Sequence, residues 1–499
     1  MEGLSIFLQT LLNGPVLLAA AGGVAWGILG GALPGISPSI AMALLLPLTY
    51  SMDPTVAIVL LASTYVGAEY GGSIPAILIR TPGTNAAAAT VIDGYEMHRQ
   101  GRGGEALGLS LVAGVIGGLF GLILLVLLTE PLARVALLFT PPAYFALGVL
   151  GLSVIASLSE GSLLKGLMAG IIGLMIATVG TDPLSGVSRF TFRIPELLEG
   201  VPFIIVMLGV FAVSELMVQS GSGEWSADLK GKVRDTRLKL PNLRTLWRLR
   251  KSQTIGCIVG AFEGIMPGAG GSVAAFLSYN EARRWSKEPE KFGHGSEEGV
   301  AAPEAANNVV ACTALVPTLS FGIPGSNSTA VLLGGLLIHG MQPGPLLFTR
   351  HPDVVYGLFS GLLMANIGML LIGMAILTPA IWLVNRPKPY LLAFIYALVF
   401  SGVYSIDHSI FDLGLVLAAG VLGYLMRAFG FPFLPLVLGV VLGYMVEANY
   451  RRSLLITNGD HIVFLRDPVS LLLLSLAALF LAIVAVREFT GRRKRAAAA

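Results

Sequence analysis

The sequence has 499 residues, of which 55% are hydrophobic and 12% are charged, whereas a soluble domain typically carries about 25% charged residues. A soluble protein of this length could not cover its surface with so few charges, and a disordered chain would be poor in Leu, Ile and Val. The formal net charge of +3 is too small to indicate nucleic-acid binding. The composition therefore indicates a protein that crosses the membrane several times.

Apolar segments of spanning or near-spanning length follow one another along the chain. Several are interrupted by Pro-Gly or are too short to cross alone, so we expect about 12 transmembrane helices. The segments lie at 16–33, 55–68, 106–128, 135–158, 161–180, 200–218, 253–266, 300–320, 354–384, 390–404, 411–426, 433–446 and 469–486.

Basic residues predict on which side of the membrane the connections lie. Residues 223–251 contain nine Lys or Arg against three acids, and the tail at 492–495 is also basic. The positive-inside rule places both segments in the cytoplasm. Residues 1–13 contain no Lys or Arg, so we expect the N-terminus outside. Arg451 and Arg452 do not fit this simple count.

A set of Gly and Pro positions occurs twice in the chain. In each half glycine recurs every fourth residue up to a Pro-Gly dipeptide, and a later proline is followed after seven residues by a second Pro-Gly. We infer a duplicated membrane unit. The first copy comprises Gly23, Gly27, Gly31, Pro34-Gly35, Pro75 and Pro82-Gly83, and the second comprises Gly256, Gly260, Gly264, Pro267-Gly268, Pro317 and Pro324-Gly325.

The second copy is nine residues longer between its Pro-Gly sites and contains a charged segment at 281–298. We predict a first membrane repeat at 1–222, a basic cytoplasmic linker at 223–252, a second membrane repeat at 253–450, and a C-terminal helix with a basic cytoplasmic tail at 451–499. Because the first copy starts outside and the second starts after a cytoplasmic linker, the repeats should be inverted, as in many secondary transporters. The expected fold is an all-α polytopic membrane protein with Pro-Gly-broken helices or re-entrant hairpins.

The four Pro-Gly breaks predict where a ligand binds. Pro and Gly together end a helix, and the free backbone groups are tolerated at membrane depth only beside protein or water. Helix N-termini with free amides and small polar residues suit a carboxylate; the alternative is that these residues only allow kinks and close helix packing. The predicted substrate-binding residues are Gly35, Ser37, Gly83, Thr84, Asn85, Gly268, Gly270, Gly271, Ser272, Gly325, Ser326, Asn327 and Ser328.

Acidic and amide side chains in apolar surroundings are candidates for binding a coupling cation, Na⁺ or H⁺. Carboxylates at membrane depth are costly and therefore functional candidates, although a helix cap or an interhelical bond explains each one equally well. No catalytic motif, metal-ligand spacing or phosphate-binding loop occurs, so we expect no enzyme activity, no structural metal and no other cofactor. The predicted coupling-ion residues are Glu69, Glu263, Asn307, Asn308 and Thr329, and Glu304 lies just before the two amides.

Several long strings are specific enough to suggest a family. They include Gly-Gly-Ser-Ile-Pro-Ala within 70–101, Ala-Pro-Glu-Ala-Ala-Asn-Asn within 299–308, Gly-Ile-Pro-Gly-Ser at 322–326 and Ile-His-Gly-Met-Gln-Pro-Gly-Pro at 338–345. Shorter matches lie at 402–405, 411–412 and 438–439. Over nearly the whole chain the sequence resembles the large membrane subunit of the tripartite tricarboxylate transporters (TctA-like).

The resemblance implies a bacterial inner-membrane secondary transporter that imports tricarboxylates or related carboxylates by symport with a cation. It also implies a periplasmic solute-binding protein and a small membrane subunit (TctB-like) as partners. Glu69 and Glu263 stand where the resemblance predicts uncharged residues, which leaves Na⁺ and H⁺ both open. The alternatives from other classes are a carboxylate channel and a membrane enzyme, for which the sequence offers no nucleophile and base.

Overall fold

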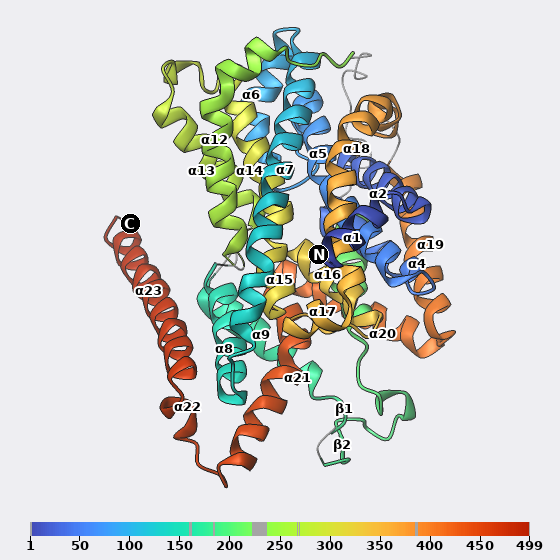
Figure 1. The fold of residues 1–499 in the computed structure, drawn as a ribbon, viewed down its shortest axis with the longest axis vertical. Coiled ribbons are helices and arrows are strands. Elements are labelled where there is room, and N and C mark those ends of the chain that lie inside the picture. Colours follow the sequence, from blue (N-terminus) through green and yellow to red (C-terminus); the bar gives the residue numbers. More distant parts are fainter. Residues whose placement is uncertain are drawn as a thin grey trace. The chain divides into compact units, whose positions relative to one another are not determined.

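In the computed structural model, the described residues are 2–158, 162–182, 185–221, 237–266, 268, 270–384 and 388–498. They are helical apart from turns and one short pair of strands (Figure 1). Pro267 and residues 223–236 of the expected linker lie outside them. The described part of that linker is not all loop, because α12 begins at Leu243 and is capped by the Asn242 side chain, which accepts from the Thr245 N–H.

Contacts divide the chain into two compact units, each built from two segments. The large unit comprises Met1–Ala133 and Glu215–His408, and the small unit comprises Arg134–Ser214 and Ser409–Ala499. The large unit contains α1 (Glu2–Leu11), α2 (Gly14–Ala32), α3 (Pro38–Ala43), α4 (Leu46–Thr49), α5 (Pro54–Ile79), α6 (Ala88–Arg99), most of α7 (Gly103–Ala136), most of α11 (Ser214–Gly221), α12 (Leu243–Ile265), α13 (Gly270–Trp285), η4 (Pro289–Lys291), α14 (Glu298–Thr313), α15 (Leu315–Phe321), α16 (Asn327–Ile338), α17 (Pro345–Arg350), α18 (Pro352–Val384) and α19 (Lys388–Asp407).

The small unit contains the remaining elements. They are α8 (Pro141–Leu158), α9 (Leu163–Ala177), β1 (Gly180–Thr181), β2 (Ser188–Arg189), η1 (Pro195–Leu197), α10 (Phe203–Met207), the π-helical η2 (Leu208–Val213), α20 (Ile410–Ala428), α21 (Phe433–Ile456), α22 (Val463–Arg466) and α23 (Pro468–Ala498).

Seven helical stretches among the described residues are long and apolar enough to cross a membrane, and several shorter apolar helices accompany them. This confirms an all-helical membrane protein; the total of about 12 spans stays a prediction. The seven stretches are Gly14–Ala32, Gly103–Ala136, Phe203–Gly221, Pro352–Leu383, Ile410–Ala428, Phe433–Ile456 and Pro468–Val486.

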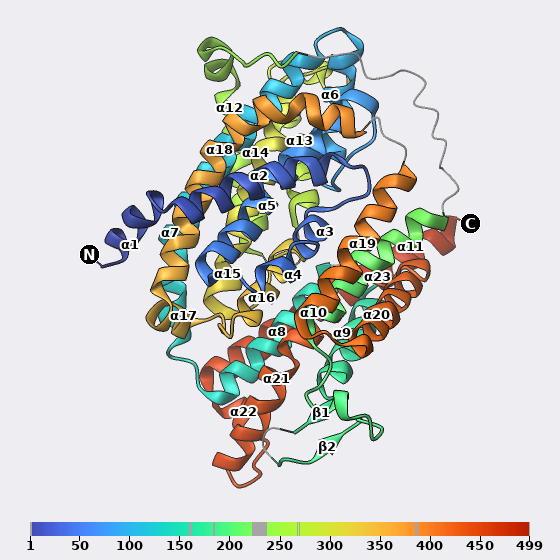
Figure 2. The same ribbon diagram turned by 90° about the vertical axis from the view of Figure 1, so that its right-hand side faces the viewer.

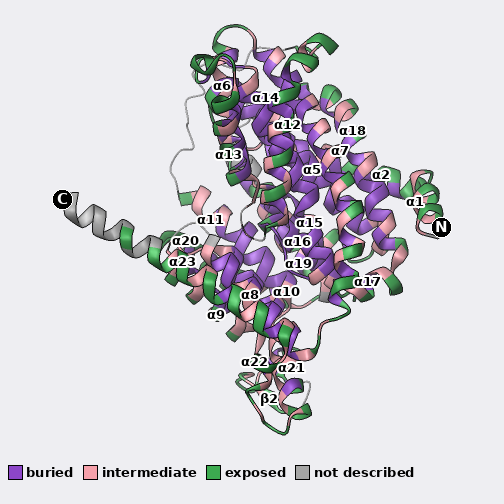
Figure 3. Cartoon of the chain, turned by 60° about the vertical axis from the view of Figure 1, so that its left-hand side comes forward, coloured by how far each residue is buried: buried purple, intermediate pink, exposed green. Residues whose placement is uncertain are grey.

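Two helices lie at the centre of the large unit. Every residue from Ala57 to Leu78 in α5 is buried, as is every residue from Gly299 to Thr313 in α14. Figure 3 shows both helices almost wholly in the colour of buried residues. A helix that is enclosed on all sides has no solvent face for its polar residues, so the polar side chains of α5 and α14 must find partners inside the protein.

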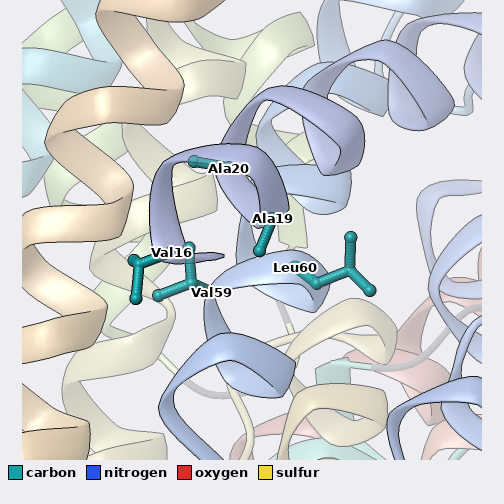
Figure 4. Close-up of a cluster of buried hydrophobic side chains, with 5 residues drawn as sticks. All are labelled: Val16, Ala19, Ala20, Val59 and Leu60. Atoms are coloured by element: carbon teal, nitrogen blue, oxygen red, sulfur yellow. The ribbon is translucent and has the colours of Figure 1, made fainter. Parts of the chain in front are cut away.

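Helix α2 packs against α5 through its glycine ladder. Val16, Ala19 and Ala20 begin the contact against Val59 and Leu60 (Figure 4). Farther along, a Cβ atom added at each ladder glycine would fall within 3.0 Å of a backbone carbonyl oxygen of α5. The absence of side chains therefore lets the two backbones approach closely. These pairs are Gly23 with Leu60, Gly27 with Thr64 and Gly31 with Ala68.

Helix α12 packs against α14 in the same way. An added Cβ at Gly256 would meet the Ala302 carbonyl oxygen, and one at Gly260 would meet that of Ala306. The third ladder glycine, Gly264, faces the Thr313 side chain. The glycines predicted as a repeat thus serve the same packing purpose in both halves.

Two long helices, α7 and α18, pack against these glycine-laddered helix pairs. Helix α7 packs on α14, where Gly117 faces the carbonyl of Ala305. Helix α18 packs on α2 and α5, where Gly361 faces Val59, and Figure 2 shows α18 beside α2. The long helix of each half of the chain therefore packs against the glycine-laddered pair of the other half.

In the small unit, ion pairs attach a short hairpin to α21. Strands β1 and β2 pair antiparallel. Arg189 bonds Glu447 at 2.6 Å, while Arg451 bonds Asp182 at 2.6 Å and Glu447 at 2.7 Å. Arg451, which did not fit the charge count, is thus paired with carboxylates of its own unit.

Candidate substrate and ion site

The second Pro-Gly break of each half follows a helix end of the same form. Helix α5 ends at Arg80 in the left-handed conformation, and the Thr81 N–H reaches back to the Pro75 carbonyl at 3.3 Å. Helix α15 ends at Gly322, also left-handed, and the Ile323 N–H reaches the Pro317 carbonyl at 3.3 Å. Each of these bonds spans six positions, one more than the 6→1 bond of a Schellman end, so both breaks are built on the same local pattern.

The break at residues 82–85, here called the first tip, is held against the glycine-laddered pair. The Gly83 N–H donates to the Gly72 carbonyl at 3.0 Å, and an added Cβ at Gly83 would collide with the Gly31 carbonyl. Thr84 is buried, and its hydroxyl accepts from the Ala87 N–H at 3.3 Å. The Asn85 side chain, by contrast, is exposed.

The break at residues 324–327, the second tip, is arranged alike. Ser326 caps α16 by accepting from the Thr329 N–H at 3.2 Å, and Thr329 accepts from the Ser326 N–H at 2.9 Å. This capping box satisfies two helix-end donors. The Gly325 carbonyl accepts from the Gly268 N–H at 3.0 Å. Asn327 is exposed, as Asn85 is at the first tip.

Each tip meets a helix that follows a Pro-Gly break of the other half. Behind the first tip, Ala86 and Ala89 cluster with Ala275 of α13. Behind the second tip, α16 packs against α3, and the Ser326 hydroxyl lies 3.3 Å from the Tyr65 hydroxyl of α5. The four breaks are therefore brought into one region of the large unit.

Glu69 and Asn307 meet in the core of this region. The Asn307 amide nitrogen donates to Glu69 at 2.9 Å, and both residues are buried. The Asn307 amide oxygen has no hydrogen-bond partner among the described residues, and it faces Gly271 in the first turn of α13. Glu69 and Asn307, both predicted coupling-ion residues, thus lie beside the start of α13, whose glycines are predicted to bind substrate.

Glu304 is the second buried carboxylate of the region. Its Oε1 accepts from Ser73 of α5 at 2.5 Å and from Thr90 of α6. Its Oε2 has no partner within hydrogen-bonding geometry. The Ser110 hydroxyl of α7 lies near this carboxyl group; it is fully buried and makes no hydrogen bond with a described residue.

Other predicted residues lie at the edge of this group or outside it. Gly35 is exposed and faces Gln219 of α11, and Ser37 caps α3.

Glu263 is half-buried on α12 and makes no hydrogen bond or ion pair with a described residue. Asn308 donates to the Glu304 carbonyl of its own helix. The remaining predicted residues include Gly268 and Gly270, with left-handed φ of +91° and +67°, the half-buried Ser272 and the buried Ser328.

The sequence did not single out the partners of Glu304. Ser73, Thr90 and Ser110 are ordinary small polar residues, separated from Glu304 by about 200 positions in the chain. Small polar residues in membrane helices most often serve helix packing. Their common signal, a hydroxyl within an otherwise apolar helix, becomes informative only when the facing carboxylate is known.

Apolar helices with broken ends and buried carboxylates are typical of membrane transport proteins. The chain belongs to the TctA family: the family model described as "Tripartite tricarboxylate transporter TctA family" matches residues 17–438. The predicted family is thereby confirmed, and with it a multi-pass transport protein rather than an enzyme.

Two proteins of Agrobacterium vitis are similar to this chain. An uncharacterised 52.8 kDa protein of the TAR-I ttuC' 3' region is 37% identical over 497 residues, which covers 97% of this chain and 96% of that protein. An uncharacterised protein of the TAR-II ttuC' 3' region is 35% identical over 229 residues, covering 45% of this chain and 94% of that protein. No solved structure matches the chain significantly.

Proposed function

We propose that this chain is the large permease subunit of a binding-protein-dependent secondary transporter. It imports tricarboxylates or related carboxylates across a bacterial inner membrane and uses a Na⁺ or H⁺ gradient. Membership of the TctA family, together with four Pro-Gly breaks gathered around buried carboxylates, supports this proposal.

The architecture proposed for this function is a pair of inverted repeats, at 1–222 and 253–450, joined by the basic cytoplasmic linker at 223–252. The C-terminal helix and its cytoplasmic tail follow at 451–499. The matched ladder contacts of α2 with α5 and of α12 with α14 support a duplication. So does the equal length of the helices behind the two tips, since α6 and α16 each have 12 residues. Alternating access then requires the broken helices at the tips to move relative to the helices that hold them.

Substrate carboxylates bind, in this proposal, at the exposed ends of the tips. Asn85 and Asn327 are exposed at matched positions, each immediately after a residue whose hydroxyl accepts the backbone N–H three residues on. Their amide N–H groups suit a carboxylate oxygen, and the start of α13 at Gly270 and Gly271 adds backbone donors. Glu69 and Asn307 lie directly behind that helix start, where a bound cation can influence the substrate site.

Two further components are proposed from family membership alone. A periplasmic solute-binding protein delivers the carboxylate, and a small TctB-like membrane subunit completes the complex. The test is uptake of labelled citrate, and of other carboxylates in turn, by cells that express all three components or lack one of them. We expect saturable uptake that requires every component and an ion gradient. Uptake that is independent of the partners, or that does not saturate, would contradict the proposal.

The site is tested by Asn85→Ala and, separately, Asn327→Ala. Each change removes a donor to a charged ligand, which contributes about 1.5–3 kcal/mol, so uptake at low substrate concentration should fall by about tenfold or more. Asn449→Ala is the matched control, because Asn449 lies in the small unit and donates only to the Met445 carbonyl of its own helix. Normal uptake by both tip variants, at wild-type membrane levels, would remove these side chains from the site.

A further inference from the structure

Glu304 lies where four helices of the large unit meet. Figure 1 shows α5, α6, α7 and α14 grouped together, and each contributes a polar group: Ser73, Thr90, Ser110 and Glu304 itself. The Glu304 side chain is 1% exposed. One of its oxygens, Oε1, accepts hydrogen bonds from two hydroxyls, whereas Oε2 has no hydrogen-bond partner among the described residues. The nearby Ser110 hydroxyl is also buried and makes no hydrogen bond with a described residue.

Among the described residues, no positive charge compensates Glu304. Neither Glu304 nor Glu69 forms an ion pair with a described Lys, Arg or His, and Glu69 bonds Asn307, one turn beyond Glu304 on the same helix. A buried unpaired carboxylate costs several kcal/mol, so such groups are usually neutralised. Titratable side chains that face α14 from the helices packed against it include Tyr65, Glu69 and Tyr70 of α5, Asp93 of α6, Cys257 of α12 and Tyr279 of α13. At the N-terminal end of α14, Arg102, just before α7, and Arg248 of α12 pair with Glu297 instead.

A proton on Glu304 lets Oε2 and the Ser110 hydroxyl, both unpaired, form a hydrogen bond with each other. Placed on Oε2 of Glu304, it removes the uncompensated charge and makes that oxygen a donor. The Ser110 oxygen is then the acceptor, while Ser73 and Thr90 continue to donate to Oε1. A bound metal cation would instead need several oxygens turned toward it, yet two of the nearby hydroxyls already donate to Oε1.

We propose that Glu304 is the site at which this transporter binds its coupling proton, held between Oε2 and the Ser110 hydroxyl. The inference rests on the proposed ion-coupled transport. Thr90 links the proton to the substrate site, because it lies in α6, the helix that begins just behind the first tip with Thr84 and Asn85. Loss of the proton leaves a buried charge that a hydrogen bond donated by Ser110 offsets only in part, which favours movement of α6 or α7 away from α14 so that water can enter.

The test uses Glu304→Gln in cells that express all three components. Glutamine has the shape of the protonated side chain but cannot release a proton. We expect accumulation driven by an imposed pH gradient to fall at least tenfold, and the alkalinisation of the medium that accompanies wild-type uptake to disappear. Exchange of labelled for unlabelled substrate, which needs no net proton movement, should stay within twofold of the wild type. Glu96→Gln, one turn from the end of α6 and paired with Arg99 at 3.1 Å, should leave all three unchanged.

A second variant keeps the carboxylate and changes only its hydrogen bonding. Thr90→Val removes a donor to the charged form, so the pH of half-maximal uptake should rise by about one unit. Thr129→Val is its control, because the Thr129 hydroxyl bonds only the Leu125 carbonyl of its own helix. An unchanged pH profile for Thr90→Val would overturn the assignment.

Other outcomes separate the two proposals. Wild-type uptake that needs Na⁺ and causes no alkalinisation would overturn the proton assignment and leave the proposed carboxylate transport standing. Full gradient-driven accumulation by Glu304→Gln would also overturn the assignment alone. If the wild type takes up no carboxylate of the panel with all its partners present, the proposed function fails, and the assignment with it.

Discussion

The glycine ladder can be tested at a single position, Gly27. An alanine there places its Cβ against the Thr64 carbonyl oxygen and within 2.8 Å of the Ala68 nitrogen. Both are backbone atoms of the buried α5, so the clash cannot be relieved by a side-chain rotation. The two helices must separate, and the polar core behind α5 moves with them.

The expected magnitude combines two opposing effects. Overpacking of a close contact costs about 1–3 kcal/mol, while replacing Gly by Ala within a helix contributes about 1 kcal/mol in favour of folding. Gly27→Ala should therefore lower the free energy of unfolding by up to about 2 kcal/mol. For a chain of this length one kcal/mol corresponds to about 1 °C, so the melting temperature of the detergent-solubilised protein should fall by up to about 2 °C.

Gly22→Ala is the matched control in the same helix. Gly22 is exposed, and an added Cβ there has nothing within 4 Å, so this variant should melt at or above the wild-type temperature. Gly260→Ala, the equivalent change in the second pair, should behave like Gly27→Ala because it meets the Ala306 carbonyl. Equal melting temperatures for Gly22→Ala and Gly27→Ala would refute the close-packing argument.

Two further predictions concern the connections. Asp93→Ala removes a buried acceptor of the Gly293, Gly295 and Ser296 N–H groups, at 2.9, 2.8 and 2.7 Å. Leaving these donors unsatisfied should destabilise the local structure by at least about 1–3 kcal/mol, so limited trypsin digestion should cut the 281–298 segment faster than in the wild type. Equal rates of cleavage would contradict the anchoring by Asp93. Single cysteines introduced at Asn13 and Lys239, both exposed, should react with an impermeant maleimide from opposite sides of the membrane. The two native cysteines are buried, so they should contribute little labelling of their own. Labelling of both introduced cysteines from one side would refute the inverted arrangement.

Most of the helices could be predicted from the sequence because they depend on local composition. The apolar segments at 16–33 and 411–426 correspond to α2 at Gly14–Ala32 and α20 at Ile410–Ala428. Boundaries were missed where polar residues continue a helix, as at α12, which begins ten residues before the expected segment at 253. A span is recognised by its hydropathy, but a helix also continues through residues outside the hydrocarbon.

The repeated Gly and Pro positions were informative because their roles are steric. A glycine every fourth residue lies on one helix face, and the structure uses that face for backbone contact in both halves. The second Pro-Gly of each half likewise stands beyond a left-handed helix end, at Arg80 and at Gly322. What the substrate-binding and coupling-ion residues do stays a prediction, although their relative placement is now described.

The membrane class, most of the helices and the duplicated Gly and Pro motif can be read from the sequence, because they follow from hydropathy and from the conformational limits of Gly and Pro. Which polar groups meet depends instead on how the helices pack. Glu69 bonds Asn307 across 238 positions, and Glu304 bonds Ser73 across 231. A helix enclosed on all sides has no solvent face, so the pattern of its sequence does not show which neighbour each side meets. A carboxylate on such a helix can be assigned a partner only when the facing helix is in place.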